Sequence, residues 1–349
     1  MWAKITTNAL KNCECSDELL THLKCWTMNK NWFAGIVSLC MISLVILSFT
    51  IKTVSYNSPS KIHTIIIDAG HGFKGSLTSR DGTFGTEISE DEVAFEVARK
   101  VTEELKRQMP DVKVLETRPT PYFIALKQRA EFANANKGNL FISIHCNFAP
   151  KIREVRREGS RTETYYVYTG KGRKKKKIRK TREVPVYKTY YHPNPANGTE
   201  TYVFAAHKTE DKEEIIMENG DIFQNEKDDS TMNNNINDPI VKQQVALWTK
   251  QFFANSVKLA SIVEEEFLNI GRFSRGVKQR QKGIWVLQAT AMPSILIELG
   301  FLSYRPEEEF LMKSEGQQQM AESIAQAVKR YKELVDKGPV VQPNINGNR

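Results

Sequence analysis

Two histidines in this chain each follow a short run of apolar residues. The run Ile65–Ile67 leads into Asp-Ala-Gly-His-Gly, which contains His71, and His145 ends the segment Leu-Phe-Ile-Ser-Ile-His. Such runs are typical of strands buried on both faces of a parallel sheet. These sheets bind ligands at the carboxyl ends of their strands, so the pattern predicts both imidazoles at one sheet edge. Metal binding and catalysis are the functions to expect there, and an ordinary turn histidine is the alternative.

A carboxylate would complete a metal site with these two histidines. Catalytic zinc sites typically use three side chains from His, Asp or Glu and leave a fourth position for water. Glu90 begins the helix expected after the first strand and is the preferred third ligand, with Glu87 as the alternative. A glutamate at a helix start also interacts favourably with the helix dipole, so its position alone is not specific.

A second carboxylate stands in an apolar strand near the end of the chain. Glu298 lies within Pro-Ser-Ile-Leu-Ile-Glu-Leu-Gly-Phe, where an unpaired charge would be costly. One interpretation is a salt-bridged residue at the end of a strand. The other is a general base with a raised pKa that activates water on the metal.

The elements that must position these residues alternate between strand and helix. Strands are predicted at Ile65–Asp68, Val112–Glu116, Leu140–His145, Gly198–Ala205, Gly283–Leu287 and Ser294–Gly300, and helices at Glu90–Gln108, Leu126–Asn136, Val241–Asn269 and Ser314–Asp336. This alternation predicts an α/β fold with a mainly parallel sheet covered on both faces. The 349 residues are enough to bury a substantial core.

The positive charge is concentrated in one segment. The net charge is +9, but residues 151–190 hold fifteen Lys and Arg against four Glu, a net +11, which leaves −2 for the rest. Residues 162–191 predict a hairpin with a basic tip. We expect anionic membrane headgroups or cell-wall polymers, and not nucleic acid, as its partners. A solvated loop is the alternative.

An apolar segment near the start predicts export of the body. Residues 33–51 are long enough to cross a bilayer as a helix. Because about 30 residues precede this segment, we expect a retained transmembrane anchor with residues 1–32 in the cytoplasm. A cleaved signal peptide is the alternative, above all if translation begins at Met28. Residues 52–61 are then a linker, and residues 337–349 a disordered tail.

Seven pieces of sequence, in order, resemble the zinc-dependent N-acetylmuramoyl-L-alanine amidases. They are Asp68-Ala-Gly-His-Gly72, Glu90, Thr117-Arg118, Leu126-x-x-Arg129-x-x-x-Ala133-Asn134, Ser143-Ile-His145-x-Asn147, Gly198-Thr-Glu-Thr-Tyr202 and Pro293-Ser-Ile-Leu-Ile-Glu298-Leu-Gly-Phe-Leu-Ser303. The resemblance covers about residues 62–332. It implies a twisted sheet flanked by helices, of the phosphorylase/hydrolase-like amidase type, in a catalytic domain at residues 62–336. It also implies cleavage of the amide between N-acetylmuramic acid and L-alanine of peptidoglycan.

The resemblance implies a role for each candidate residue. His71, Glu90 and His145 correspond to the zinc ligands, and Glu298 corresponds to the catalytic glutamate. The location implied is the cell envelope or periplasm, in cell-wall remodelling or daughter-cell separation. Arg118 and Arg129 are expected to be structural ion-pair partners. The alternatives are a non-catalytic wall-binding relative and a zinc peptidase of related fold.

An insert at about residues 150–237 resembles that of the cell-separation type. In those relatives a helix covers the zinc, and Met217-Glu218-Asn219 is similar to part of that helix. Glu218 is therefore predicted to occupy the open zinc position until an activator protein displaces the insert. A solvated polar loop is the alternative.

Overall fold

The main sheet has strands β1 (Thr64–Ala69), β4 (Lys113–Glu116), β5 (Leu140–Asn147), β8 (Thr199–Val203), β9 (Ser274–Gln279) and β10 (Ser294–Phe301). A computed structural model describes residues 61–75, 80–219 and 238–337. The strand order is β4-β1-β5-β10-β8-β9. The first four are mutually parallel, whereas β8 runs antiparallel to β10 and parallel to β9. The prediction of a mainly parallel α/β sheet is confirmed.

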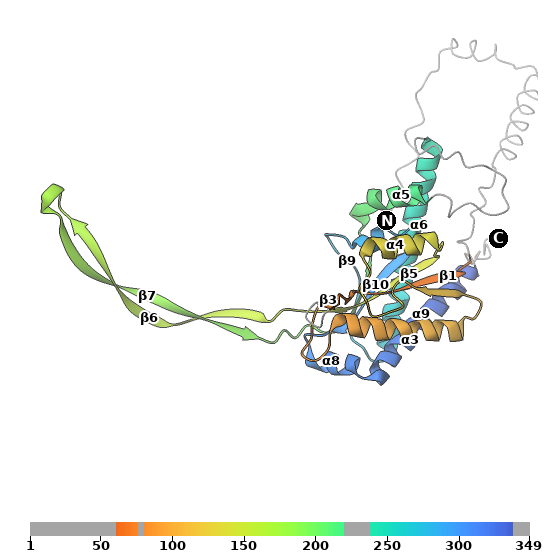
Figure 1. Cartoon of the computed structure of the whole chain (residues 1–349), viewed down its shortest axis with the longest axis horizontal. Coiled ribbons are helices and arrows are strands. Elements are labelled where there is room, and N and C mark those ends of the chain that lie inside the picture. Colours follow the sequence, from red (N-terminus) through yellow and green to blue (C-terminus); the bar gives the residue numbers. More distant parts are fainter. Residues whose placement is uncertain (1–60, 76–79, 220–237, 338–349) are drawn as a thin grey trace, which may run out of the picture. The chain divides into compact units, whose positions relative to one another are not determined.

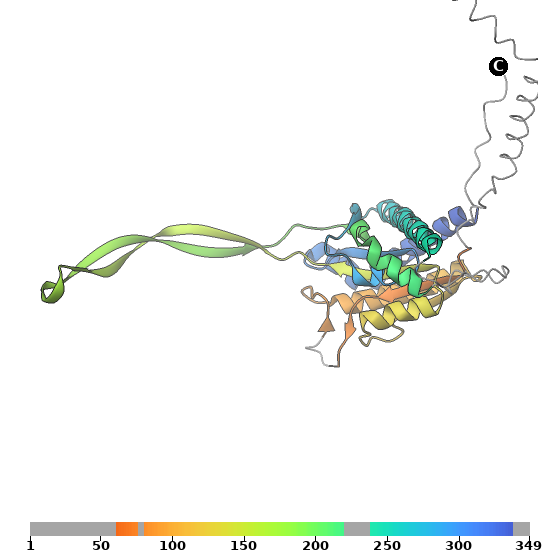
Figure 2. The same ribbon diagram turned by 90° about the horizontal axis from the view of Figure 1, so that it is seen from above.

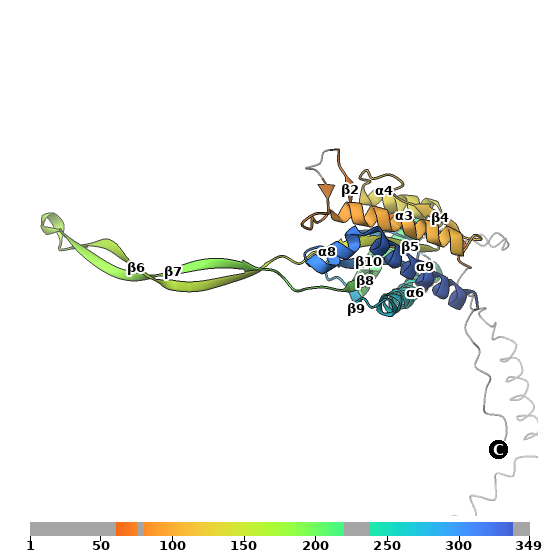
Figure 3. The ribbon, with the colours of Figure 1, turned by 90° about the horizontal axis from the view of Figure 1, so that it is seen from below.

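Helices cover both faces of this sheet (Figure 1). Helices α3 (Glu90–Gln108), α6 (Pro239–Asn269) and α9 (Ser314–Asp336) pack on the face that carries Ile65 and Ile67. Helices α4 (Leu126–Ala135) and α7 (Trp285–Gln288) pack on the face that carries Ile66. Successive strand side chains point to opposite faces, so the three isoleucines contribute to both hydrophobic layers. Figure 3 shows α3 and α9 from another side.

The remaining elements are short or peripheral. Helix α5 (Thr209–Glu218) packs against α6 and α7, and α8 (Arg305–Met312) leads into α9. Strands β2 (Gly72–Phe73) and β3 (Arg80–Asp81) form a small separate sheet directly after β1. The single turns η2 (Gly172–Lys174) and η3 (Ala206–Lys208) are 3₁₀ helices.

Two sequence expectations differ from the structure in this part of the fold. The predicted strand Gly283–Leu287 is wrong, because Trp285–Gln288 is the short helix α7. The strand is β9, which lies at the sheet edge and, among the described strands, pairs with β8 alone. An edge strand does not need apolar residues on both faces. The sequence Ser-Arg-Gly-Val-Lys-Gln has a single apolar side chain, so its strand pattern is weak. Helix α5 includes Met217 and Glu218, so this part of the insert is helical and not the polar loop that was the alternative.

The predicted hairpin exists and is longer than residues 162–191. Strands β6 (Ile152–Thr169) and β7 (Lys176–His192) form a separate two-stranded ribbon. In Figure 2 it extends away from the main sheet. The longer pairing includes Arg-Glu-Val-Arg-Arg, a charged stretch with little strand signal.

The predicted membrane segment, residues 33–51, lies outside the described residues. Within the ranges that the structure describes, no helix combines the length and apolar composition needed to cross a bilayer. The predicted linker up to residue 60, residues 220–237 of the insert and the tail from residue 338 also lie outside them.

Candidate metal centre

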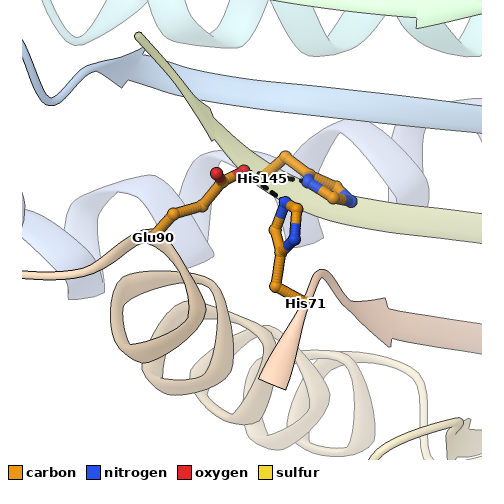
Figure 4. Close-up of side chains that lie close together, drawn as sticks. All are labelled: His71, Glu90 and His145. Atoms are coloured by element: carbon orange, nitrogen blue, oxygen red, sulfur yellow. Dashed lines mark hydrogen bonds and ion pairs between the residues drawn. The ribbon is translucent and has the colours of Figure 1, made fainter. Parts of the chain in front are cut away.

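The two histidines meet at the carboxyl edge of neighbouring strands. Strand β1 runs parallel to β5, with Asp68 opposite Ser143, so His71 and His145 leave the sheet at the same edge. Glu90, the first residue of α3, points toward both (Figure 4). One nitrogen or oxygen from each of the three side chains lies within 4.8 Å of the others. The structure thus brings the three predicted metal ligands together.

The carboxylate of Glu90 contacts both imidazoles. Its Oε1 lies 3.0 Å from His71 Nε2 and 2.9 Å from His145 Nδ1. The two rings are nearly perpendicular, with centroids 4.8 Å apart. Nitrogen and oxygen donors converge here without a bulky side chain between them. Two imidazoles and one carboxylate are the donor set of many catalytic zinc sites, so the residues present fit Zn²⁺.

The backbone around the centre leaves space for the rings. His71 itself has φ +58°, a left-handed conformation that is uncommon for a residue other than glycine. A Cβ at Gly70 would lie 2.4 Å from His145 Cε1, and one at Gly82 would lie 2.8 Å from His71 Cγ. Backbone strain of this kind persists where the surrounding structure fixes it, and it clusters at functional sites.

The second oxygen of Glu90 is fixed by the loop before α3. Glu90 Oε2 accepts hydrogen bonds from Thr83 N at 2.8 Å and Thr83 Oγ1 at 3.0 Å. Burial alone would raise the Glu90 pKa, but the hydrogen bonds and charges of both histidines lower it well below the usual range. Glu90 is therefore ionised, as a metal ligand must be.

The alternative ligand Glu87 lies elsewhere. Its carboxylate forms an ion pair with Arg305 Nη2 at 2.6 Å on the surface. The backbone N–H groups of Thr86 and Glu87 donate to the buried carboxylate of Glu308. The loop is thus tied to α8 and presents Glu90, and not Glu87, to the histidines.

The residues next to His71 form a buried polar network. Asp68 accepts hydrogen bonds from Thr117 and Ser143. It also forms an ion pair with Arg129, at 3.0 Å. Burial would raise the Asp68 pKa, but Arg129 and the two hydroxyls outweigh it, so the pKa is lowered. Arg129 also donates to the carbonyl of His71. Asp68 therefore supports the turn and is not among the grouped ligands.

Arg118 completes this network through backbone carbonyls. It donates to the carbonyl oxygens of Ala69, Gly70 and Asp91 at 3.0–3.1 Å. Burial lowers the pKa of Arg118 to about 10. The expected ion pair is present for Arg129, whereas the hydrogen bonds of Arg118 run to carbonyl groups.

Glu298 lies across the sheet edge from His145. The two residues are directly opposite on the parallel strands β10 and β5. Glu298 is 5% exposed, and its Oε2 has no hydrogen-bond partner among the described residues. Arg280 Nη2 is 3.9 Å from Oε1. Burial, followed by the negative charge of Glu90, raises the Glu298 pKa to about 8.

Glu200 is a third buried carboxylate at this edge, opposite Glu298 on β8. Lys278 Nζ at 2.8 Å and Arg275 Nε contact its Oε1, and Tyr202 OH donates to Oε2 at 2.6 Å. Burial would raise the Glu200 pKa, but these partners lower it to about 2. Sequence reasoning noted Glu200 only within a family motif. The missed signal is the alternation in Thr199-Glu200-Thr201-Tyr202, which puts Glu200 and Tyr202 on the same face of a strand.

The structure does not bring Glu218 to the three grouped ligands. Glu218 is exposed at the end of α5. Lys212 of the same helix donates to the carbonyl of Met292, just before β10 begins, at 3.1 Å. Ile216 packs with Ala291 at that end of the strand too, whereas Glu298 lies toward its other end. A contact between Glu218 and a bound metal would require another position of α5.

Comparison with known proteins identifies the family. The family model described as N-acetylmuramoyl-L-alanine amidase matches residues 65–330. The uncharacterized protein YqiI of Bacillus subtilis is 23% identical over 274 residues, 78% of this chain and 86% of that protein. The amidase AmiC of Escherichia coli O6:H1 is 26% identical over 270 residues, 76% of this chain and 52% of AmiC.

The crystal structure of an N-acetylmuramoyl-L-alanine amidase from Clostridium difficile 630 aligns with a TM-score of 0.47 at 22% identity, over 78% of this chain and 98% of that one. Because the family model spans most of the described residues and both strand-end histidines, the chain belongs to the N-acetylmuramoyl-L-alanine amidase family.

Proposed function

We propose that this member of the peptidoglycan amidase family works through Zn²⁺ held by His71, Glu90 and His145, with Glu298 as the general base. The observation that carries the proposal is the convergence of the three ligand side chains beside one buried, unpaired carboxylate oxygen. The bond cleaved is the amide between N-acetylmuramic acid and L-alanine. A bound zinc ion supplies a polarising charge for the scissile carbonyl and lowers the pKa of a water toward ~7.

Glu298 performs the proton transfers in this mechanism. Its carboxylate accepts a proton from the attacking water and returns it to the departing nitrogen of L-alanine. A group that both takes and gives a proton works best with a pKa near the working pH. The raised Glu298 pKa, about 8, has this property. The positive charge of a bound metal would offset the negative charge of Glu90 and would therefore lower the pKa of Glu298.

Glu90 and the residues around His71 hold the ligands in place. Asp81 Oδ2 lies 3.4 Å from His71 Nδ1, and Glu90 faces the other ring nitrogen. Burial would lower the His71 pKa, but Glu90 and Asp81 raise it. A histidine that binds a metal commonly donates its other ring N–H to a carboxylate, and Asp81 is placed to orient the ring in this way.

Glu200 is proposed to keep Glu298 as the proton carrier. Three strong partners hold Glu200 ionised, and its negative charge disfavours a second charge on Glu298. The two carboxylates therefore differ widely in pKa, which separates a fixed anion from a group that changes its protonation.

Digestion of purified sacculi tests the activity and its metal dependence. Mass spectrometry is expected to detect intact stem peptides with a free N-terminal L-alanine. A chelator should abolish their release, added Zn²⁺ should restore it, and a Glu298→Gln variant should give none. Products cleaved only inside the peptide would identify a peptidase instead, and no products from the zinc-loaded chain would favour a wall-binding relative.

We also propose that residues 62–336 form a catalytic domain that acts outside the cytoplasmic membrane. The peptidoglycan substrate supports this location, because it lies in the envelope. Residues 33–51 would anchor the chain or direct its export.

We further propose that an activator protein moves α5. Its test is whether Glu218→Ala changes basal hydrolysis of sacculi, because a blocking Glu218 predicts a higher rate.

A further inference from the structure

The β6–β7 ribbon carries the positive charge of the chain and takes no part in the metal centre. Its outer part, residues 164–182, contains nine Lys and Arg and no Asp or Glu. The two strands pair with each other and with no other strand in the described residues. Almost every side chain on the ribbon is exposed. The ribbon extends away from the sheet in all three views (Figures 1–3).

Cationic side chains lie on both faces of the outer ribbon. On one face Lys180 is opposite Tyr165, and on the other Lys177 is opposite Tyr168. Directly opposed residues share a face, and successive residues alternate between faces. The turn between the strands, residues 170–175, is Gly-Lys-Gly-Arg-Lys-Lys and has no apolar side chain. A ligand can therefore meet positive charge from any side.

Two of the three exposed tyrosines in the outer ribbon, Tyr165 and Tyr166, have a cation over the ring. Lys177 Nζ lies 4.1 Å from the ring centroid of Tyr166, and the Arg182 guanidinium lies 5.4 Å from that of Tyr165. Both contacts are within cation–π range. They direct the cations along the ribbon and cover part of the ring faces.

The ribbon has no hydrophobic core of its own. An isolated two-stranded hairpin is at best marginally stable in water. Both outer edges of this one are open, and the dense positive charge opposes pairing with a second copy. A partner of opposite charge would relieve the repulsion among the lysines and stabilise the extended form.

We propose that the outer ribbon binds a linear polyanion with repeated phosphate groups. A flexible chain can pass along both faces, whereas a flat membrane surface would meet one face or the tip. Stable insertion into a membrane also requires apolar side chains, which the tip lacks. Single-stranded nucleic acid is bound largely by base stacking on open aromatic faces, and cations cover part of the rings of two of the three tyrosines in the outer ribbon. The ribbon would then hold the enzyme on a phosphate-rich polymer.

The test measures binding of the full-length chain, in a non-ionic detergent, to immobilised inorganic polyphosphate over a series of salt concentrations. The variant replaces Lys174, Lys175, Lys176 and Lys177 with Gln. Binding should weaken about tenfold or more, and the salt dependence of log K should fall by about 0.7 per lysine removed. The matched control replaces four exposed lysines outside the ribbon: Lys106, Lys113, Lys127 and Lys313. The control should bind like the unaltered chain.

Competition separates this proposal from its rivals. Free polyphosphate should displace the chain at a lower phosphate concentration than mixed micelles of phosphatidylglycerol or an oligothymidylate do. More effective displacement by the micelles or by the oligonucleotide would overturn the proposal, and so would equal weakening in the variant and the control. Hydrogen exchange of β6 amides checks the fold: unchanged protection in the free variant and added protection with polyphosphate in the unaltered chain are expected. No peptidoglycan is present, so the result is independent of the amidase mechanism.

Discussion

Glu298 and His145 lie directly opposite each other on the parallel strands β10 and β5, at the edge where β1 delivers His71. This register places a buried carboxylate beside the predicted metal ligands without any contribution from a loop. Strand pairing is rigid, so Glu298 and His145 keep a fixed relation. The same register puts Glu200 on the other side of Glu298. Apart from Glu90, the site is thus largely a property of four adjacent strands, β1, β5, β10 and β8.

Replacing Glu298 with Gln tests its role in proton transfer. The amide fills nearly the same space but accepts no proton. We expect kcat on sacculi to fall by about 10²- to 10⁴-fold, the range for loss of a general acid–base group. Zinc content, measured in the same sample, should remain unchanged. A variant that keeps most of its kcat would show that another group moves the proton.

The ion pair between Asp68 and Arg129 should contribute strongly to stability. Both side chains are almost fully buried, so Asp68→Asn leaves the Arg129 charge without its partner. We expect the free energy of unfolding to fall by about 3–5 kcal/mol, measured by urea denaturation. Glu96→Gln, which breaks an exposed pair with Arg99, is the control and should cost about 1 kcal/mol or less. Equal losses in the two variants would contradict a supporting role for Asp68.

The ionised state of Glu200 predicts a dependence of stability on pH. Its folded-state pKa, about 2, lies below the value near 4.3 expected for an unfolded chain. A lowered carboxyl pKa stabilises the fold above the unfolded value, and this contribution is lost as pH falls. Wild type should therefore exceed Glu200→Gln in stability at pH 6, and the difference should narrow as the pH falls through the window from about 4.3 to about 2.

Thermal unfolding at a series of pH values measures this difference. Glu131→Gln, at an exposed position on α4, reports the effect of removing one carboxylate from the surface. A gap between wild type and Glu200→Gln that stays constant down to pH 2 would show that Glu200 does not titrate as described.

The sequence predicted those parts of the fold that depend on local patterns. The apolar runs before His71 and His145 fixed two central strands, and the helices Glu90–Gln108 and Ser314–Asp336 begin and end where predicted. Strand β9 was not predicted, because an edge strand is half solvated and has a weak apolar pattern. The extra length of the ribbon was not predicted, because its charged residues are exposed on both faces. The sequence there has no alternation of apolar and polar residues.

The candidate site was predictable in its residue types but not in all its contacts. The sequence favours Glu90 over Glu87 only by its place at the helix start, whereas the Arg305 pair and the Glu308 contacts show what holds Glu87 away from the histidines. The cationic partners of Glu200 come from β9, about 75 residues later, so no local pattern shows them. The position predicted for Glu218 depends on how α5 packs, which Lys212 and Ile216 decide in this structure.

Zinc content combined with activity tests the central claim most directly. Chains purified with Zn²⁺ and freed of excess metal should contain about one zinc ion each, as expected for a three-ligand catalytic site. His71→Ala, Glu90→Ala and His145→Ala should each lose most of the metal and the release of stem peptides, whereas Glu298→Gln should keep the metal and lose activity. Full zinc content in His145→Ala, or full activity in a metal-free chain, would contradict the account.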